Sequence, residues 1–520
     1  MIKVLRTVLA ALAILFGPSA VAAVAAEPVV HAAAGPIIGV RHAGIVSYQG
    51  IPYARPPVGT HRWTAPQAVP AWTTPLRADH FGADCMQKPF IYDSAPIRTV
   101  PSEDCLYLNI WAPKGPARAK RPVMVWVHGG GFVNGGSSPA VYDGGAFARS
   151  GVVFVSLNYR LGRFGSFAFP GLAGQNGEAP MANFGLLDQI AALKWIKRNI
   201  AAFGGDPDNV TLFGESAGGM SVHLLIMSAS TRGLFARAIV ESGGGRDLLG
   251  GMESLPQAQA VAGDFARRHG IDSAAPDALD KLRALPPEAV VDDLNLGTLL
   301  DRTDFSGPII DGTSVASQVG AAYAKGDVAH IPMLVGSNDA DGLFDQDNLD
   351  AAYALAGAHR ARAETLYDPD GKHDAHRIGT AIWADTMMIE PARFVSRAVA
   401  SLGQPVYAYR FAYVATSLRA SQAGASHASE IPYVFDTIDS AYGAKASAGD
   451  LHEARLVHDA WVGFAKTGRP VVSGQATWRP CDPNADKLML FGLDAAVMAA
   501  DPYKTRLDFV ESLHGPDAGE

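Results

Sequence analysis

The sequence of 520 residues predicts an α/β fold in which helices flank a mostly parallel central sheet. Short runs rich in Val, Ile and Leu recur along the chain, and such runs are typical of strands that are buried on both faces of a parallel sheet. Helical patterns lie between several of these runs, and alternation of strands with helices favours parallel pairing through right-handed crossovers. A hydrophobic content of 48% is sufficient for one large core.

The elements follow from local patterns. Residues 35–57 alternate around glycines, which predicts an antiparallel hairpin that enters the larger sheet. Helices are predicted at 186–199 and 217–228, and an amphipathic helix at 453–466. The candidate buried strands are 106–111, 122–127, 152–157, 209–213, 238–242, 331–335 and 406–411.

Two regions, about 250–330 and 345–404, are more helical, polar and alanine-rich than the rest. We interpret them as insertions that cap the sheet, so that residues 27–520 form a single domain. Residues 1–26 differ: Lys3 and Arg6 precede an apolar stretch at 8–16, which leads to small residues ending at Ala26. This layout is typical of a secretory signal peptide and predicts export to the periplasm or the medium.

Composition limits the classes of partner. The formal charge of −8 comes without clusters of basic residues, so nothing favours nucleic acid or an anionic membrane surface as a partner. No internal apolar run is long enough to span a bilayer. The sequence contains no paired-cysteine metal signature, and we expect neither a metal nor a cofactor. The oligomeric state is not predicted.

The chain has three cysteines. Cys85 and Cys105 are close enough in sequence to close a short loop, which an oxidising compartment would keep as a disulfide. Cys481 is left over, and we interpret it as a buried thiol rather than as half of an intermolecular bridge.

Ser216 is the candidate nucleophile. It is the central residue of a Gly-Glu-Ser-Ala-Gly run at 214–218, after a predicted strand and before a predicted helix. A sharp strand-to-helix turn exposes the hydroxyl, and glycines on either side leave room for the converging backbones. The five-residue pattern alone is weak evidence for a nucleophile, so the assignment depends on the neighbouring segments of the sequence.

A second run supports this interpretation: the sequence His-Gly-Gly-Gly-Phe at 128–132 follows the predicted strand 122–127. Three consecutive glycines are costly to order, and only residues without side chains let an acyl oxygen approach the backbone closely. We expect the N–H groups of Gly130 and Gly131 to form an oxyanion hole, with a third N–H from Ala217 at the start of its helix.

Several motifs together resemble the type-B carboxylesterases of the α/β-hydrolase fold, a family that includes the cholinesterases. They are found at 50–59 (GIPYARPPVG), 102–109 (SEDCLYLN), 128–132 (HGGGF), 158–162 (NYRLG) and 203–218 (FGGDPDNVTLFGESAG). The resemblance covers almost the whole chain. It implies that Cys85–Cys105 is the family's N-terminal disulfide, and that Arg62–Glu103 and Arg160–Asp188 are its internal ion pairs.

The resemblance also identifies the catalytic base and acid. His427 lies in a segment similar to the family's catalytic-histidine segment, except that Ala428 stands where glycine is usual. The family's acid is a glutamate that closes a G-x-x-x-D-E-G segment, and here Asp341 takes its place in the run 336–342 (GSNDADG). Asp339 is the rival candidate and Asp345 a more remote one.

These residues predict an exported serine carboxylesterase with a Ser-His-Asp triad and an acyl-enzyme intermediate. The partner is a small-molecule ester, and Phe132 and Phe344 suggest apolar or aromatic groups on it. The alternatives are the same triad acting on amides or carbamates or as an acyltransferase, and a cholinesterase-like binding protein without catalysis. Glu215, which resembles a buried glutamate of the family, is expected to bias the site electrostatically.

Overall fold

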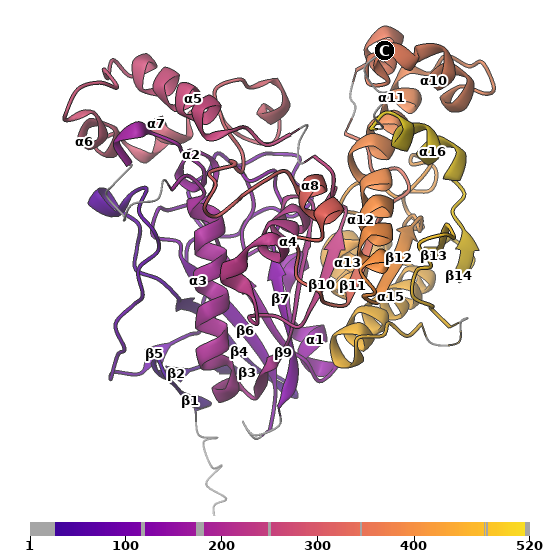
Figure 1. Cartoon of the computed structure of the whole chain (residues 1–520). Coiled ribbons are helices and arrows are strands. Elements are labelled where there is room, and N and C mark those ends of the chain that lie inside the picture. Colours follow the sequence, from indigo (N-terminus) through magenta and orange to yellow (C-terminus); the bar gives the residue numbers. More distant parts are fainter. Residues whose placement is uncertain are drawn as a thin grey trace, which may run out of the picture.

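The computed structural model describes residues 27–115, 120–172, 181–247, 251–343, 346–472, 474 and 477–514. The expected signal peptide lies outside the described residues. Within the described part, eleven strands form one sheet in the order β14-β13-β12-β11-β10-β9-β7-β8-β6-β4-β3, with helices on both sides (Figure 1). A smaller sheet of β1, β2 and β5 lies at the N-terminal end of the described chain.

The central strands pair in parallel. All neighbours from β8 through β7, β9, β10, β11 and β12 to β13 are parallel, whereas β3, β4 and β6 at one side and β14 at the other pair antiparallel. The strands are β1 Val29–Ala32, β2 Gly35–Ile38, β3 Val40–Arg41, β4 Ile45–Pro52, β5 Leu76–Arg77, β6 Tyr107–Pro113, β7 Arg121–Val127, β8 Val153–Leu157, β9 Gly205–Glu215, β10 Arg237–Glu241, β11 Met333–Asn338, β12 Val406–Phe411, β13 Lys487–Phe491 and β14 Ala496–Ala500.

All seven predicted buried strands are present, as β6 to β12, and the predicted fold class is confirmed. Two differences have physical causes. β6 pairs antiparallel with both neighbours, because the chain enters the sheet through the N-terminal hairpin rather than through a helix. The C-terminal hairpin of β13 and β14 was not predicted, since β14 forms the edge of the sheet, where burial is incomplete.

Alternate side chains of each strand supply two separate cores, one on each face of the sheet. Val123, Val125 and Val127 of β7 point into a core that also contains residues of α3 (Phe184–Asn199), α4 (Ala217–Met227), α8 (Val319–Lys325) and α12 (Glu390–Ser401). Met124 and Trp126 of the same strand point to the opposite face, which α1 (Gly145–Arg149), α13 (Ile431–Val434) and α15 (Ala448–Thr467) cover. This period-two pattern fixes the register of the strand.

The remaining helices form two groups at the same end of the sheet (Figure 1). α2 (Gly162–Gly165), α5 (Leu255–Arg268), α6 (Ala278–Arg283) and α7 (Pro287–Val291) surround one small apolar cluster. α9 (Leu349–Ala354), α10 (Arg360–Tyr367), α11 (Ala375–Ala384) and α16 (Lys504–Ser512) share another. α14 is Ile438–Tyr442. α8 and α12 fall in the two expected insertions, yet they pack on the sheet and contribute to its core.

No helix of the described chain is both long enough and apolar enough to cross a membrane.

Candidate active site

The turn between β9 and α4 holds Ser216 in an unusual backbone conformation, with φ 55° and ψ −126°. Its N–H donates to the carbonyl oxygen of Glu241 at 2.9 Å, which fixes the turn to the neighbouring strand β10. A Cβ atom at position 218 would lie 2.0 Å from the carbonyl oxygen of Val127, and one at position 214 would lie 2.6 Å from the same oxygen. Both glycines are therefore required for the helix and the strand to cross this closely.

The glycine loop after β7 lies against this turn. Gly130, Gly131 and Phe132 all have positive φ values, of 104°, 61° and 62°. A Cβ atom at Gly129 would lie 3.1 Å from Cβ of Ser216, so the two segments are in contact. Ala217 is the first residue of α4, where the helix offers its N–H no intrahelical acceptor. The structure thus brings the three residues expected in an oxyanion hole to the neighbourhood of Ser216.

His427 and Asp341 are joined directly. Nδ1 of His427 lies 2.6 Å from Oδ1 of Asp341, whose side chain is fully buried. The two residues lie in loops that follow β12 and β11, which are parallel neighbours. The other carboxylate oxygen, Oδ2, accepts from Oγ of Ser242 at 2.6 Å and from the N–H of Asn338 at 3.0 Å. These bonds hold the carboxylate in one orientation toward the imidazole.

Asp339 has a different task. Its Oδ1 accepts from the N–H of Ala425 at 2.6 Å, so it ties the loop that carries His427 to the loop that follows β11. Burial raises the pKa of Asp339, although the hydrogen bond opposes this. Asp339 is not the residue that bonds His427, and Asp345 lies outside the described residues. Of the three candidate acids, the structure brings Asp341 to the imidazole.

The other ring nitrogen faces the residue that precedes the candidate nucleophile. Nε2 of His427 lies 3.2 Å from Oε1 of Glu215. Among the described residues, no hydrogen bond joins the hydroxyl of Ser216 to His427. Oε1 of Glu215 is buried and has no hydrogen-bond partner in the described chain, so the contact with Nε2 is close but not aligned as a hydrogen bond. His427 therefore reaches the residue next to Ser216.

The two groups in this contact influence each other's protonation. Burial raises the pKa of Glu215 well above its usual range, and the charge of His427 opposes that shift. Burial disfavours the imidazolium of His427, but the facing carboxylates of Glu215 and Asp341 outweigh it and raise the pKa of the ring.

Three residues of this site were missed from the sequence: Ser242, Asn338 and Glu430. Ser242 and Asn338 support Asp341 as described above, and Nδ2 of Asn338 also donates to Oε2 of Glu430 at 2.6 Å. Burial raises the pKa of Glu430 to about 7. Ser242 and Asn338 lie at the carboxyl ends of β10 and β11, where open α/β sheets place their site residues, and this rule could have singled them out.

Two other buried histidines, His128 and His458, have different surroundings. His128 is buried, its ring stacks on Tyr159 with centroids 4.4 Å apart, and burial lowers its pKa to about 4. His458 on α15 bonds the carbonyl oxygen of Val434 through Nδ1. Within the described residues, no group of three or more His, Cys, Asp or Glu side chains could hold a metal ion.

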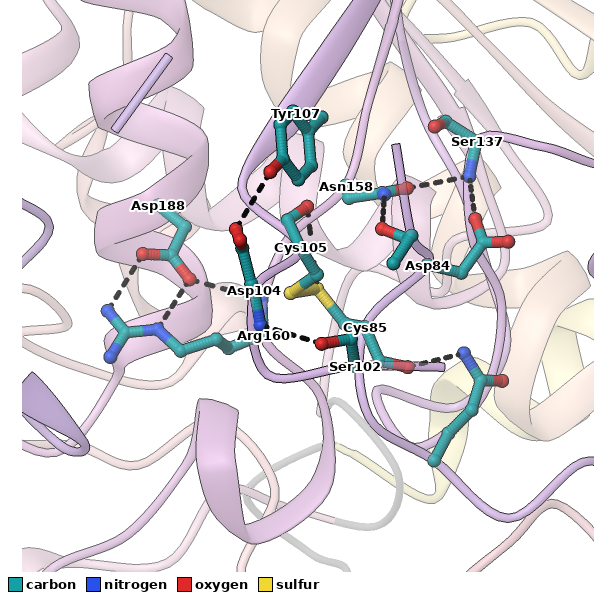
Figure 2. Close-up of a disulfide and its surroundings, with 12 residues drawn as sticks. Asp84, Cys85, Ser102, Asp104, Cys105, Tyr107, Ser137, Asn158, Arg160 and Asp188 are labelled. Atoms are coloured by element: carbon teal, nitrogen blue, oxygen red, sulfur yellow. Dashed lines mark hydrogen bonds and ion pairs between the residues drawn. A yellow bond between two sulfur atoms is a disulfide. The ribbon is translucent and has the colours of Figure 1, made fainter. Parts of the chain in front are cut away.

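The predicted disulfide is present between Cys85 and Cys105, whose Cα atoms are 4.9 Å apart (Figure 2). The two expected ion pairs are also present. Arg62 pairs with Glu103 at 2.6 Å, and Arg160 pairs with Asp188 at 2.8 Å.

Cys481 is partly buried and unpaired, and burial raises the pKa of its thiol to about 11. Phe132 is 8% exposed, and Phe344 lies outside the described residues.

Comparisons with known proteins agree with this architecture. The model of the carboxylesterase family matches residues 26–373 and 358–510. Para-nitrobenzyl esterase of Bacillus subtilis (strain 168) is 37% identical over 459 residues, which cover 84% of this chain and 89% of that protein. Fumonisin B1 esterase of Sphingopyxis macrogoltabida is 33% identical, with 89% of this chain and 86% of that protein covered.

Carboxylesterase 1C of Rattus norvegicus is 30% identical, with 86% of this chain and 85% of that protein covered. A solved structure of PNB esterase superimposes with a TM-score of 0.80 at 32% identity and covers 93% of this chain and 99% of its own. The chain therefore has the α/β-hydrolase fold, belongs to the carboxylesterase family and is a carboxylic ester hydrolase.

Proposed function

We propose that this chain is an exported serine carboxylesterase that works through Ser216, His427 and Asp341. The observation that carries the proposal is the bond of 2.6 Å between Nδ1 of His427 and the buried carboxylate of Asp341, with Nε2 of the same ring directed to the residue beside Ser216. A histidine held in this way has its proton on Nδ1 and presents a basic Nε2.

In this mechanism His427 takes the proton of Ser216 as the hydroxyl oxygen attacks the ester carbonyl carbon. The negative charge that develops on the carbonyl oxygen is stabilised by the N–H groups of Gly130, Gly131 and Ala217. The alcohol leaves with the proton from His427. Water then attacks the acyl-enzyme with His427 as base, and the carboxylic acid leaves as Ser216 regains its proton.

The positions of Ser216 and the glycine loop support these roles. Ser216 occupies the strand-to-helix turn at the end of a central parallel strand, which exposes the side chain at the edge of the sheet. Gly129 contacts this turn, and the two glycines assigned to the oxyanion hole both have positive φ values.

The proposal is tested by hydrolysis of p-nitrophenyl esters with Ser216→Ala and His427→Ala beside the wild type. We expect both variants to lose activity by at least about 10³-fold and to keep the fold. A fluorophosphonate should label the peptide that contains Ser216, as read by mass spectrometry. Ser221→Ala removes another serine of α4 and serves as the matched control, which should still be labelled. Labelling of a different serine would contradict the assignment.

The names of two relatives suggest first substrates. Para-nitrobenzyl esterase suggests p-nitrobenzyl esters, and fumonisin B1 esterase suggests fumonisin B1. The half-buried Ser216 and the apolar Phe132 at the end of the glycine loop favour esters with apolar or aromatic groups. Turnover of matched amides and carbamates in the same assay compares ester hydrolysis with the hydrolysis of these substrates. An added alcohol as acyl acceptor tests whether the triad also transfers the acyl group.

Export is proposed from the composition of residues 1–26. The Cys85–Cys105 disulfide is of the kind that forms in an oxidising compartment and supports the proposal. Intact-mass measurement of the protein recovered from periplasm or medium should show a chain that begins near residue 26 or 27. A full-length chain that stays in the cytoplasm would contradict export and leave the chemistry unaffected.

A further inference from the structure

The side chain of Gln87 lies against the glycine loop. It is 5% exposed and comes two residues after Cys85. Its Nε2 donates to the carbonyl oxygen of Gly135 at 2.6 Å, and its Oε1 accepts from the N–H of the same residue at 3.0 Å. The side-chain amide therefore bonds both the N–H and the carbonyl oxygen of Gly135. Oε1 also accepts from Nδ2 of Asn134 at 3.1 Å.

Asn134 and Gly135 are continuous with the glycines assigned to the oxyanion hole. The carbonyl oxygen of Gly130 accepts from the N–H groups of Val133 and Asn134 at 3.0 and 2.8 Å. These two bonds close a tight turn around Gly131. A change in the position of Asn134 would therefore change the direction of the peptide planes on either side of Gly130.

This turn needs support from outside. Gly130, Gly131, Phe132 and Gly135 all have positive φ, which is a sparsely populated region for Phe132. Such conformations persist only where the surroundings determine them. Bonds within the loop, to the Gly130 carbonyl oxygen, fix the start of the turn. Gln87, from outside the loop, fixes its end at Asn134 and Gly135.

The segment that carries Gln87 is itself anchored. Cys85 is bonded to Cys105, which lies two residues before the strand β6 (Figure 2). Nε2 of Gln87 also donates to the Cys85 carbonyl oxygen at 3.0 Å. Oδ1 of the buried Asp84 accepts from the N–H groups of Ser137 and Ser138 at 3.1 and 3.3 Å. The segment 84–87 thus binds the chain just after the glycine loop at several points.

We propose that Gln87 is a positioning residue for the oxyanion hole, an inference that rests on the proposed function. Its amide holds Asn134 and Gly135, and through them it sets the N–H groups of Gly130 and Gly131 before substrate binds. Donors fixed in advance stabilise the charge that develops in the transition state without the cost of reorientation. Loss of Gln87 should therefore lower kcat more than it raises KM.

The first test compares Gln87→Met and Gln87→Glu with the wild type. Methionine has a similar length and forms none of the four bonds, and glutamate keeps an acceptor at Oε1 but loses both donated bonds. Since small misplacements of catalytic groups cost up to about 100-fold, we expect kcat to fall about 10- to 100-fold with KM within about twofold. Asn199→Leu is the matched control, because it removes a buried amide that bonds Trp195 and Ala34 instead of the loop.

The second test uses a trifluoromethyl ketone that matches the substrate. The oxygen of Ser216 adds to its carbonyl carbon, the proton passes to His427, and the ketone oxygen becomes an oxyanion in the hole. We expect Ki for the ketone to rise by the same factor by which kcat/KM falls. Ki for the corresponding trifluoromethyl alcohol, which has no carbonyl group, should stay constant. A structural role alone would not separate these two ligands.

The outcomes are distinct. Parallel losses in kcat/KM and ketone affinity, absent in Asn199→Leu, support the proposal. Unchanged kcat in a folded Gln87→Met, or a rise in KM alone, overturns it. Should Gln87→Met fail to fold, Gln87→Glu decides by the same two readouts. If Ser216→Ala keeps wild-type activity, the proposed function fails, and that result is independent of Gln87.

Discussion

Replacing Asp341 or Asp339 by asparagine separates two carboxylates that are two residues apart and have different partners. Asp341 accepts three hydrogen bonds, from His427, Ser242 and the backbone N–H of Asn338. Asparagine has one acceptor oxygen and an NH₂ group that can only donate. In Asp341→Asn this group must face either the donors of Ser242 and Asn338 or the ring nitrogen of His427.

The magnitude follows from this geometry. If the new NH₂ donates to Nδ1, the ring must carry its proton on Nε2 and can no longer accept the proton of Ser216. The corresponding change in a Ser-His-Asp protease lowers kcat by about 10⁴, which equals about 5.5 kcal/mol at 1.36 kcal/mol for each tenfold. Asp339→Asn keeps an oxygen for the N–H of Ala425, so we expect a loss below about tenfold.

The assay is kcat for a p-nitrophenyl ester at pH 8, with circular dichroism to show that both variants are folded. Asp341→Asn should lose about a thousand times more activity than Asp339→Asn. Equal losses, or a larger loss in Asp339→Asn, would refute the assignment of Asp341 as the acid. Ser242→Ala, which removes one bond to Asp341 and keeps the charge, should fall between the two.

Three further outcomes are expected. Glu215→Gln removes the carboxyl group 3.2 Å from His427, so the acid limb of the pH–rate profile should move to lower pH, by about 0.5 to 1 unit, and an upward shift would contradict the contact. Burial raises the pKa of Glu453 from 4.5 to about 7, so this group lowers the free energy of unfolding progressively as pH rises from about 4.5, where the unfolded chain ionises, to about 7, where the folded chain does, and by a constant amount above that. Glu453→Gln should therefore raise the free energy of unfolding by about 3 kcal/mol at pH 8 and by less than about 1 kcal/mol at pH 5, as read from urea titrations. Replacing Cys85 and Cys105 together by serine should lower the free energy of unfolding by about 3 kcal/mol, because the closed loop spans 20 residues, and an unchanged urea midpoint would exclude this contribution.

The fold was predictable because its central strands carry a local signal. A run such as β7 is apolar on both faces, which indicates a buried strand. The segments between several such runs show the periodicity of helices. The edge strand β14 carries no such signal, because only one of its side chains is fully buried. α8 and α12 lie in polar, alanine-rich stretches, so their packing on the sheet depends on tertiary contacts that composition does not reveal.

For the site, the motif and its neighbours led to Ser216 and the family resemblance to His427 and Asp341, and the structure joins the last two directly. The contact of His427 with Glu215 could not be predicted, since it depends on the rotation of one ring between two carboxylates. Gln87 was missed for a related reason. Its bonds go to backbone atoms, and a sequence gives no sign of which peptide groups a side-chain amide will meet.

The loops that carry Asp341 and His427 follow the adjacent strands β11 and β12, and an isolated β-bridge between Ala340 and Ser426 joins them. The helices α9 to α12 lie between these loops in the sequence, yet the relative placement of acid and base is set by the register of β11 with β12 and by the bonds that join the two loops. Changes in the length of α9 and α10 that leave these bonds intact should therefore leave the acid and the base in their relative positions.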